Sequence, residues 1–216
     1  MSSLAHPPHS RAGVVDRNPH HLEHEATWTR EIALRWLESP RRQRSGDADR
    51  LWAMVDLRPR EVVADIGAGT GYFALPAAAL VGPRGRVYAI DVSRELLKLI
   101  EDRVGRSKLA VQTVRSTPQR IPLRSRLADV VLLANVLHGL PITTVAESFR
   151  LLRPGGRLVV VEWVPHRGRE GPPASRRLSP RRASDRLRAH GGTVLAQGRL
   201  SRSEYVLVAT RARRPP

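Results

Sequence analysis

Two acidic residues in the first half of the chain each follow a run of apolar residues, and a glycine-rich turn comes directly after the first of them. Residues 62–71 read Val-Val-Ala-Asp-Ile-Gly-Ala-Gly-Thr-Gly, and residues 87–91 read Val-Tyr-Ala-Ile-Asp. Glycine adopts backbone angles that are barred to other residues, and it removes side chains that would keep a ligand away from the main chain. The first segment therefore predicts a site at which a nucleotide-like ligand touches the backbone.

The spacing of the glycines narrows the kind of ligand. Gly67, Gly69 and Gly71 form Gly-x-Gly-x-Gly. Dinucleotide-binding folds instead carry Gly-x-Gly-x-x-Gly, whose third glycine packs a helix on a strand beside the pyrophosphate. Pyrophosphate is therefore not the expected ligand, and a nicotinamide-dependent oxidoreductase ranks last among the functions considered. An ordinary tight turn would be the better interpretation of an isolated glycine triplet, but the two strands and two acids around this one favour cofactor binding.

The segment from Ala64 to Phe73 resembles the first motif of the class I methyltransferases, which bind S-adenosylmethionine, and the strand-like run ending at Asp91 follows at the distance typical of that family. The resemblance extends over roughly residues 28–210. It implies that Asp91 binds both ribose hydroxyls, because each carboxylate oxygen can accept one hydrogen bond from the diol. It also implies that Asp65 orients the glycine turn and the methionine end of the cofactor; a carboxylate that merely caps the turn is the alternative.

Two further cofactor-binding positions come from the same resemblance. Thr117 stands where many relatives have an aspartate that accepts a hydrogen bond from the adenine amino group, as judged by aligning Ile121-Pro122-Leu123 with their Leu-Pro-Phe. A neutral hydroxyl can accept that bond, but more weakly than a carboxylate. Asn135, at the end of the run from Ala128, is expected to lie beside the methionine moiety.

The segment that begins at Asn135 also bears on the methyl acceptor. It reads Asn-Val-Leu-His, whereas methylases of DNA base amino groups typically carry Asn-Pro-Pro-Tyr there, so the sequence argues against that activity. His138 could act as a general base on a hydroxyl or thiol acceptor, since an unperturbed imidazole titrates near neutral pH. A structural histidine at the rim of the pocket is the favoured interpretation, and no catalytic residue is assigned.

From residue 61 onward, strand-like and helix-like runs alternate, which is typical of a parallel sheet covered by helices on both faces. We predict an α/β, Rossmann-like fold with a seven-stranded, mostly parallel sheet whose last two strands form an antiparallel hairpin. Ser93 is expected to cap a helix and Gly105 to end it. The predicted strands are 61–66, 86–91, 110–115, 128–134, 157–163, 193–197 and 204–210, and the predicted helices are 71–81, 93–104, 143–152 and 179–190.

The chain divides into three parts in this interpretation. Residues 1–26 are rich in histidine and proline and are expected to lack fixed structure. Residues 27–60 are expected to form helices that cover the pocket, one over 27–38 that Pro40 stops and one over 47–56. Residues 61–212 form the predicted methyltransferase domain. Three histidines of the first part could bind a metal on one helical turn, but a polar terminal segment is favoured and no metal site is predicted: His20, His21 and His24.

Composition excludes several classes of function. At 216 residues the chain is long enough for one α/β domain, and it contains no cysteine, so disulfides and thiol chemistry are excluded. No apolar run is long enough to cross a bilayer and no secretory signal is present, which predicts a cytoplasmic protein with no membrane partner. The net charge of +17 is almost wholly due to arginine and is concentrated in the last quarter of the chain. A solvated basic surface is favoured over a nucleic-acid-binding patch.

The predicted function is therefore an S-adenosylmethionine-dependent methyltransferase that acts on a small molecule. An RNA- or other nucleic-acid-directed methyltransferase is a second hypothesis, because of the arginines in the last quarter of the chain. A third is a cofactor-binding protein without catalytic activity, because Thr117 replaces the aspartate and no base is identified.

Overall fold

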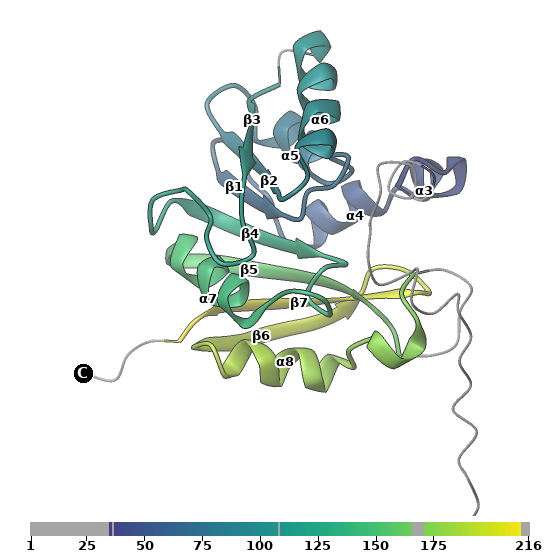
Figure 1. The fold of residues 1–216 in the computed structure, drawn as a ribbon, viewed down its shortest axis with the longest axis vertical. Coiled ribbons are helices and arrows are strands. Elements are labelled where there is room, and N and C mark those ends of the chain that lie inside the picture. The colour runs from purple at the N-terminus through teal and green to yellow at the C-terminus, as the bar shows by residue number, and fades with distance from the viewer. Residues whose placement is uncertain (1–34, 36, 108, 166–170, 213–216) are drawn as a thin grey trace, which may run out of the picture.

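The structure is a computed structural model that describes residues 35, 37–107, 109–165 and 171–212. A sheet of seven strands runs through the protein, as Figure 1 shows. Its strand order is β3-β2-β1-β4-β5-β7-β6. Strands β1 to β5 are parallel, whereas β7 runs antiparallel to both β5 and β6. The strands are β1 (Val62–Ile66), β2 (Arg86–Asp91), β3 (Val111–Arg115), β4 (Ala128–Ala134), β5 (Leu152–Trp163), β6 (Gly192–Arg199) and β7 (Glu204–Arg211). The predicted Rossmann-like architecture and its final hairpin are confirmed.

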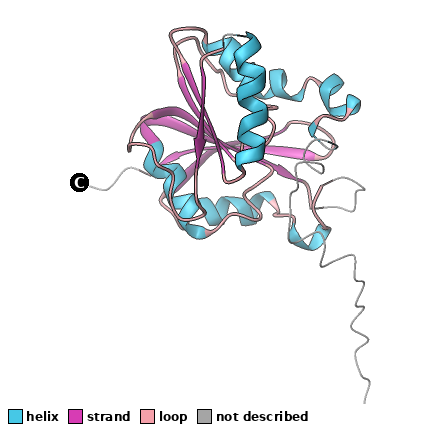
Figure 2. Cartoon of the chain, turned by 45° about the horizontal axis from the view of Figure 1, so that its top comes forward, coloured by secondary structure: helices cyan, strands magenta, loops and turns pink. Residues whose placement is uncertain are grey.

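Helices cover both faces of the sheet (Figure 2), and they do so because alternate residues of each strand point to opposite faces. Val63 of β1 belongs to the core beneath α4 (Asp47–Met54), α5 (Ala74–Val81) and α6 (Arg94–Ser107). Its neighbour Ala64 belongs to the core beneath α7 (Ile142–Leu151) and α8 (Pro180–Arg188). The central strand β4 is buried on both sides from Ala128 to Leu133. This two-sided burial explains its continuous apolar sequence.

Most helix ends follow the local signals. The hydroxyl of Ser93 accepts a hydrogen bond from the Leu96 N–H at 3.2 Å, so its predicted capping role is confirmed. The prediction that Gly105 ends the helix is wrong, because α6 continues to Ser107. An exposed glycine costs a helix only about 1 kcal/mol relative to alanine, which is too little to stop it. The helix after the glycine turn begins at Ala74, later than predicted, because the turn itself continues through Phe73.

A short helix that the sequence did not predict precedes α4. Pro40 does not merely stop a helix; it begins α3 (Pro40–Ser45), in which the Ser39 hydroxyl accepts a hydrogen bond from the Arg42 N–H at 3.3 Å. The sequence of α3, Pro-Arg-Arg-Gln-Arg-Ser, has no apolar periodicity, so no helix signal was available apart from the serine-proline start. The predicted helix at 47–56 is confirmed as α4.

Some predictions fall on residues that are not described. Residues 1–26, with His20, His21 and His24, lie outside the described residues, as does most of the segment 27–38. Within the described part of the chain, no three histidine, cysteine, aspartate or glutamate side chains are grouped so that they could hold a metal ion. Among the same residues no helix has both the length and the apolarity to span a bilayer.

Arg157 of β5 fastens the segment between α4 and β1 to the sheet. Its guanidinium donates to both carboxylate oxygens of Glu61, at 2.8 and 2.7 Å, and to the carbonyl oxygens of Val55 and Asp56, each at 2.8 Å. The Arg157 guanidinium also contributes to holding the pKa of the Glu61 carboxyl below its usual range, against the opposing effect of burial. A single side chain thus satisfies four acceptors in a partly buried place.

Replacement of Arg157 with alanine should lower the free energy of unfolding by about 2–3 kcal/mol, because it leaves a partly buried carboxylate and two carbonyls without their donor. Urea denaturation followed by circular dichroism measures this change. Arg58→Ala is the matched control, since Arg58 pairs with Asp56 at the exposed surface and its loss should leave stability unchanged. Equal stabilities of the two variants would contradict the prediction.

Candidate functional site

A cavity of about 490 Å³ opens at the carboxyl ends of β1, β2 and β4, where ligands bind in open parallel sheets. Of the seven predicted site residues, five line it directly: Asp65, Gly67, Asp91, Thr117 and Asn135. Gly69 and Gly71 belong to the same turn as Gly67 but do not line the cavity. The fold thus brings together residues that are as far apart in sequence as 65 and 135.

The glycine turn adopts a backbone that other residues would resist. Gly67, Gly69 and Gly71 have φ angles of 76°, 56° and 84°. The N–H groups of Gly67 and Ala68 both donate to the Ile90 carbonyl, at 2.8 and 3.0 Å, so the turn is fastened to the end of β2. A Cβ atom at Gly67 would lie 2.7 Å from the Cγ1 atom of Val136, which lines the cavity. Both the backbone conformation and the close neighbour therefore require glycine at position 67.

Asp91, at the end of β2, is held against this turn. Its Oδ2 atom accepts a hydrogen bond from the Gly69 N–H at 3.0 Å, and its Oδ1 atom accepts one from the Ser93 N–H at 2.9 Å. Burial raises the pKa of the Asp91 carboxyl, and these two bonds oppose that rise. Each carboxylate oxygen can accept a second hydrogen bond. Asp91 is therefore oriented by the backbone while it retains acceptor capacity toward the cavity.

Asp65, at the end of β1, is buried, with 1% of its surface exposed. Its Oδ1 atom has no hydrogen-bond partner among the residues that the structure describes. Burial, helped by the nearby charge of Asp91, raises the pKa of the Asp65 carboxyl to about 7. An unsatisfied carboxyl in a buried place is costly, and a cationic group that enters the cavity would remove this cost.

Asn135 directly follows β4 and lines the same cavity. Its φ angle is 58°, and its N–H donates to the Val161 carbonyl at 2.7 Å. The side-chain Nδ2 donates to Oε1 of Glu204 at 2.6 Å, while Oδ1 is buried with no partner in the described part of the chain. Like Asp65, Asn135 thus offers the cavity an acceptor that the protein does not use.

Thr117 lies on the exposed side of the cavity. Its hydroxyl already accepts a hydrogen bond from the Arg120 N–H at 3.1 Å, and the backbones of the two residues are paired by bonds of 3.0 and 3.3 Å. A hydroxyl that stabilises its own turn has less capacity for a ligand than a carboxylate would have.

His138 lines the cavity from the loop after β4, and Glu162 of β5 holds it there. Glu162 is fully buried; its Oε1 atom accepts a bond from the His138 N–H at 2.9 Å and lies 3.0 Å from Nδ1 of the imidazole. A carboxylate can only accept, so this contact fits a ring that donates from Nδ1 and carries its lone pair on Nε2. The arrangement is that of an oriented base.

Arg42 of α3 lines the cavity, which the sequence did not predict. It is 9% exposed, and its guanidinium carbon lies 4.5 Å from the ring centroid of Tyr72 and 5.7 Å from that of Phe73. Its Nη1 atom donates to Oε1 of Glu204 at 3.4 Å, and the Tyr72 hydroxyl donates to its carbonyl at 3.0 Å. Tyr72 directly follows the glycine turn, so this stack closes the cavity over that turn.

Comparison with known proteins agrees with this geometry. A family model described as a methyltransferase domain matches residues 64–160. Ubiquinone/menaquinone biosynthesis C-methyltransferases UbiE from Cupriavidus metallidurans and Ectopseudomonas mendocina are 31% and 35% identical over 126 and 130 residues, which is 55% of this chain in each case. These matches cover 52% and 50% of the two relatives, so the chain spans about half the length of the curated relatives it matches.

Solved structures share the fold. A SAM-dependent methyltransferase from Aquifex aeolicus superposes with a TM-score of 0.79 at 24% identity, over 85% of this chain and 98% of that one. Residues 64–160 therefore match a methyltransferase domain, and the chain shares the fold of S-adenosylmethionine-dependent methyltransferases. A protein named as the [4+2]-cyclase SpnF also superposes, with a TM-score of 0.67 at 19% identity, over 78% of this chain and 80% of that one. The fold therefore does not by itself fix the reaction.

The residues of this cavity fit S-adenosylmethionine. The buried Oδ1 atoms of Asp65 and Asn135 lack partners among the described residues, and the ammonium of a methionine chain is a donor of the kind they lack. The glycine turn lets a ligand approach the main chain, and Asp91 keeps lone pairs for hydroxyl groups. The free hydrogen-bond acceptors and the open backbone of the turn both suit a cationic ligand that carries a sugar diol.

Sequence reasoning missed three features of the site. Arg42 gave no signal, because it lies in a helix without apolar periodicity. Glu204 could have been found: a strand that runs antiparallel to its parallel neighbours begins at the edge where they end, so its first residue faces the site. Arg186 of α8 donates to the Leu137 carbonyl at 2.7 Å and so supports the loop that carries His138.

Proposed function

We propose that this protein transfers a methyl group from S-adenosylmethionine to a small-molecule acceptor. The observation that carries the proposal is the cavity at the ends of β1, β2 and β4, in which Asp65 presents an unpartnered, buried carboxyl beside a glycine turn and the oriented carboxylate of Asp91. Its volume of about 490 Å³ lies in the usual range for small-ligand sites.

These residues would contact different parts of the cofactor. Asp91 would accept hydrogen bonds from the two ribose hydroxyls, one on each carboxylate oxygen. Asp65 and Asn135 would accept from the ammonium of the methionine part. Thr117 would contact the adenine amino group, with a weaker bond than an aspartate would give. Gly67 would keep the cavity free of a side chain at the end of β1, and Gly69 and Gly71 would let the turn adopt the positive φ angles that it needs.

S-adenosylmethionine, when bound, supplies a methyl group on a cationic sulfur that departs as a neutral thioether. The contribution of this chain is then to hold the acceptor in line and to remove its proton where it carries one. His138 is placed for the second task, because Glu162 fixes its tautomer and leaves the lone pair on Nε2. The same pair stabilises the imidazolium that forms when the proton is taken.

Isothermal titration with S-adenosylmethionine tests the proposal first, and the wild-type chain is expected to bind. A metabolite extract incubated with the protein and an isotopically labelled methyl donor then identifies the acceptor as the species that gains the label. The proposal is abandoned when the wild-type chain does not bind the donor at saturating concentration, or when it binds the donor and no species in the extract becomes labelled.

The affinity for S-adenosylmethionine should rise with pH below neutrality. The Asp65 carboxyl, with its pKa raised to about 7, is protonated in the free protein at pH 6, whereas an ammonium ligand requires the carboxylate. Binding therefore releases a proton, and the affinity increases by up to about tenfold per pH unit until pH 7, where the dependence levels off. Titrations at pH 6 in two buffers of different ionisation enthalpy count the released protons.

Asp65→Asn is the control for this dependence. The amide cannot ionise, so the variant should bind more weakly and lose most of the slope below pH 7. The free energy of unfolding responds in the opposite sense: since the folded pKa of Asp65 lies above its unfolded value of 3.8, stability falls as pH rises from 4 to 7, and Asp65→Asn should reduce that fall. An unchanged slope in the variant would contradict the role given to Asp65.

A further inference from the structure

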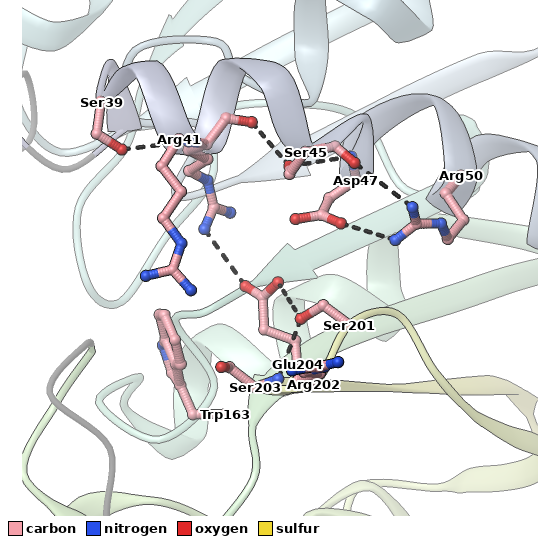
Figure 3. A pocket seen from close by; sticks show the side chains of 11 residues that line it. Ser39, Arg41, Ser45, Asp47, Arg50, Trp163, Ser201, Arg202, Ser203 and Glu204 are labelled. Carbon is pink, nitrogen blue, oxygen red and sulfur yellow. Dashed lines mark hydrogen bonds and ion pairs between the residues drawn. The ribbon is translucent and has the colours of Figure 1, made fainter.

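A second cavity, of about 470 Å³, is drawn in Figure 3. It lies between α3 and the start of α4 on one side, and the end of β5 and the turn from β6 to β7 on the other. Arg42 lines both cavities. Figure 3 shows Arg41 reaching from α3 toward Trp163 at the end of β5, and Arg42 donates to Glu204 at the start of β7.

The charges around this second cavity are unequal. Four guanidinium groups and two carboxylates line it: Arg41, Arg42, Arg50, Arg202, Asp47 and Glu204. Both carboxylates are buried and engaged, since Asp47 pairs with Arg50 at 3.0 Å and Glu204 accepts from Arg42 and from Asn135. Arg202 is exposed and has no carboxylate partner within the described part of the chain. The exposed guanidinium groups therefore give the mouth of the cavity a positive charge, whereas both carboxylates are buried below it.

The second cavity meets the proposed methyl donor site at Arg42, which lines both cavities, and at the hydrogen bond between Asn135 and Glu204. The Asn135 side chain lines the first cavity and donates to Glu204, which lines the second. Asn135 is also the residue placed beside the methionine end of the donor, where the transferable methyl group lies. A molecule in the second cavity would therefore lie next to the reacting end of the donor.

Trp163 gives the second cavity an apolar surface. It is the last residue of β5, is 3% exposed, and lines the cavity opposite α3. Guanidinium groups and an indole ring together suit a ligand that has both an anionic group and a flat or apolar body, because arginine binds carboxylates and phosphates through paired N–H donors.

We propose that the second cavity binds the methyl acceptor, and that the acceptor is a small molecule bearing a carboxylate or phosphate on an aromatic or apolar body. The proposal rests on the methyl transfer proposed above and specifies the acceptor class. The anionic group contacts the arginines at the mouth, and the body of the acceptor lies along Trp163 toward Asn135.

The test uses three probes that share a benzene ring: benzoate, phenyl phosphate and benzamide, the last having the shape of benzoate without its charge. Their dissociation constants are measured by ligand-observed nuclear magnetic resonance on the full chain saturated with S-adenosylhomocysteine. Benzoate or phenyl phosphate should bind about tenfold more tightly than benzamide, since only the anions form charge-assisted bonds. Whichever anion binds more tightly identifies the preferred group.

The double variant Arg41→Gln, Arg202→Gln should lose about tenfold in affinity for the anions while it binds the donor as the wild type does. Arg84→Gln, Arg86→Gln is the matched control: it removes the same charge from exposed positions at the opposite end of the sheet and should change neither affinity. Benzamide binding as well as the anions, or anion binding that survives in the double variant, overturns the inference. A wild-type chain that binds donor but shows no anion preference overturns this inference alone, whereas failure to bind donor overturns the proposed function.

Discussion

Replacement of Asp91 with alanine should weaken binding of S-adenosylmethionine by about 100-fold or more. The change removes two charge-assisted hydrogen bonds to the ribose, each contributing about 1.5–3 kcal/mol, and about 1.4 kcal/mol corresponds to a factor of ten. It also removes the carboxylate that holds the Gly69 and Ser93 N–H groups, so the turn loses part of its support. Isothermal titration measures the change in dissociation constant.

Two variants separate the ligand contact from the structural one. Asp102→Ala removes an exposed aspartate from α6 and should bind the donor as the wild type does. Asp91→Asn keeps the shape of the side chain and one acceptor oxygen, so its loss should be smaller, about tenfold. An Asp91→Ala protein that melts near the wild-type temperature and binds donor within about threefold of wild type would rule out the ribose role.

Replacement of His138 with alanine should lower kcat by about 100-fold or more for an acceptor that loses a proton, because a positioned general base contributes about 100- to 10,000-fold. The donor should still bind with its normal affinity, since no donor contact is assigned to the ring. Single-turnover rates with the acceptor found in the labelled extract measure the effect.

Chemical rescue distinguishes a base from a packing residue. Imidazole added to His138→Ala should restore part of kcat, which a purely structural histidine would not allow. His190→Ala is the matched control, because the His190 imidazole bonds to the Arg186 carbonyl at the end of α8 and does not line the cavity. Full activity of His138→Ala would show that the ring only shapes the rim of the pocket.

The sheet was predictable because each strand carries its own signal. β4 is buried on both faces and reads as one apolar run, and each of the first two strands ends in an acid. β5 is the exception: it begins at Leu152, where Ala128 pairs with it ahead of a shift in register, and not at Arg157 as predicted. A pairing of this kind depends on the partner strand and leaves no mark in the local sequence.

The site was predictable where it follows the carboxyl ends of parallel strands. Asp65 and Asp91 lie at the ends of their strands, and Asn135 directly follows β4, so this rule agrees with their selection. It could not select Arg42, whose burial depends on stacking against Tyr72 and pairing with Glu204. The local sequence does not show whether an arginine is buried. Its apolar stem can pack against other residues while its charged head stays in water, so its burial depends on the tertiary structure.

The position of Arg42 in the wall of both cavities has a thermodynamic consequence. A ligand in one cavity that moves this side chain alters the surface offered to a ligand in the other. If occupancy by an anionic probe changes the affinity for S-adenosylhomocysteine by some factor, then S-adenosylhomocysteine must change the affinity for that probe by the same factor. Both affinities can be measured in the wild-type protein and in a variant without the Arg42 guanidinium. The ratio of the affinities gives the coupling free energy between the two cavities, and the variant shows how much of it depends on Arg42.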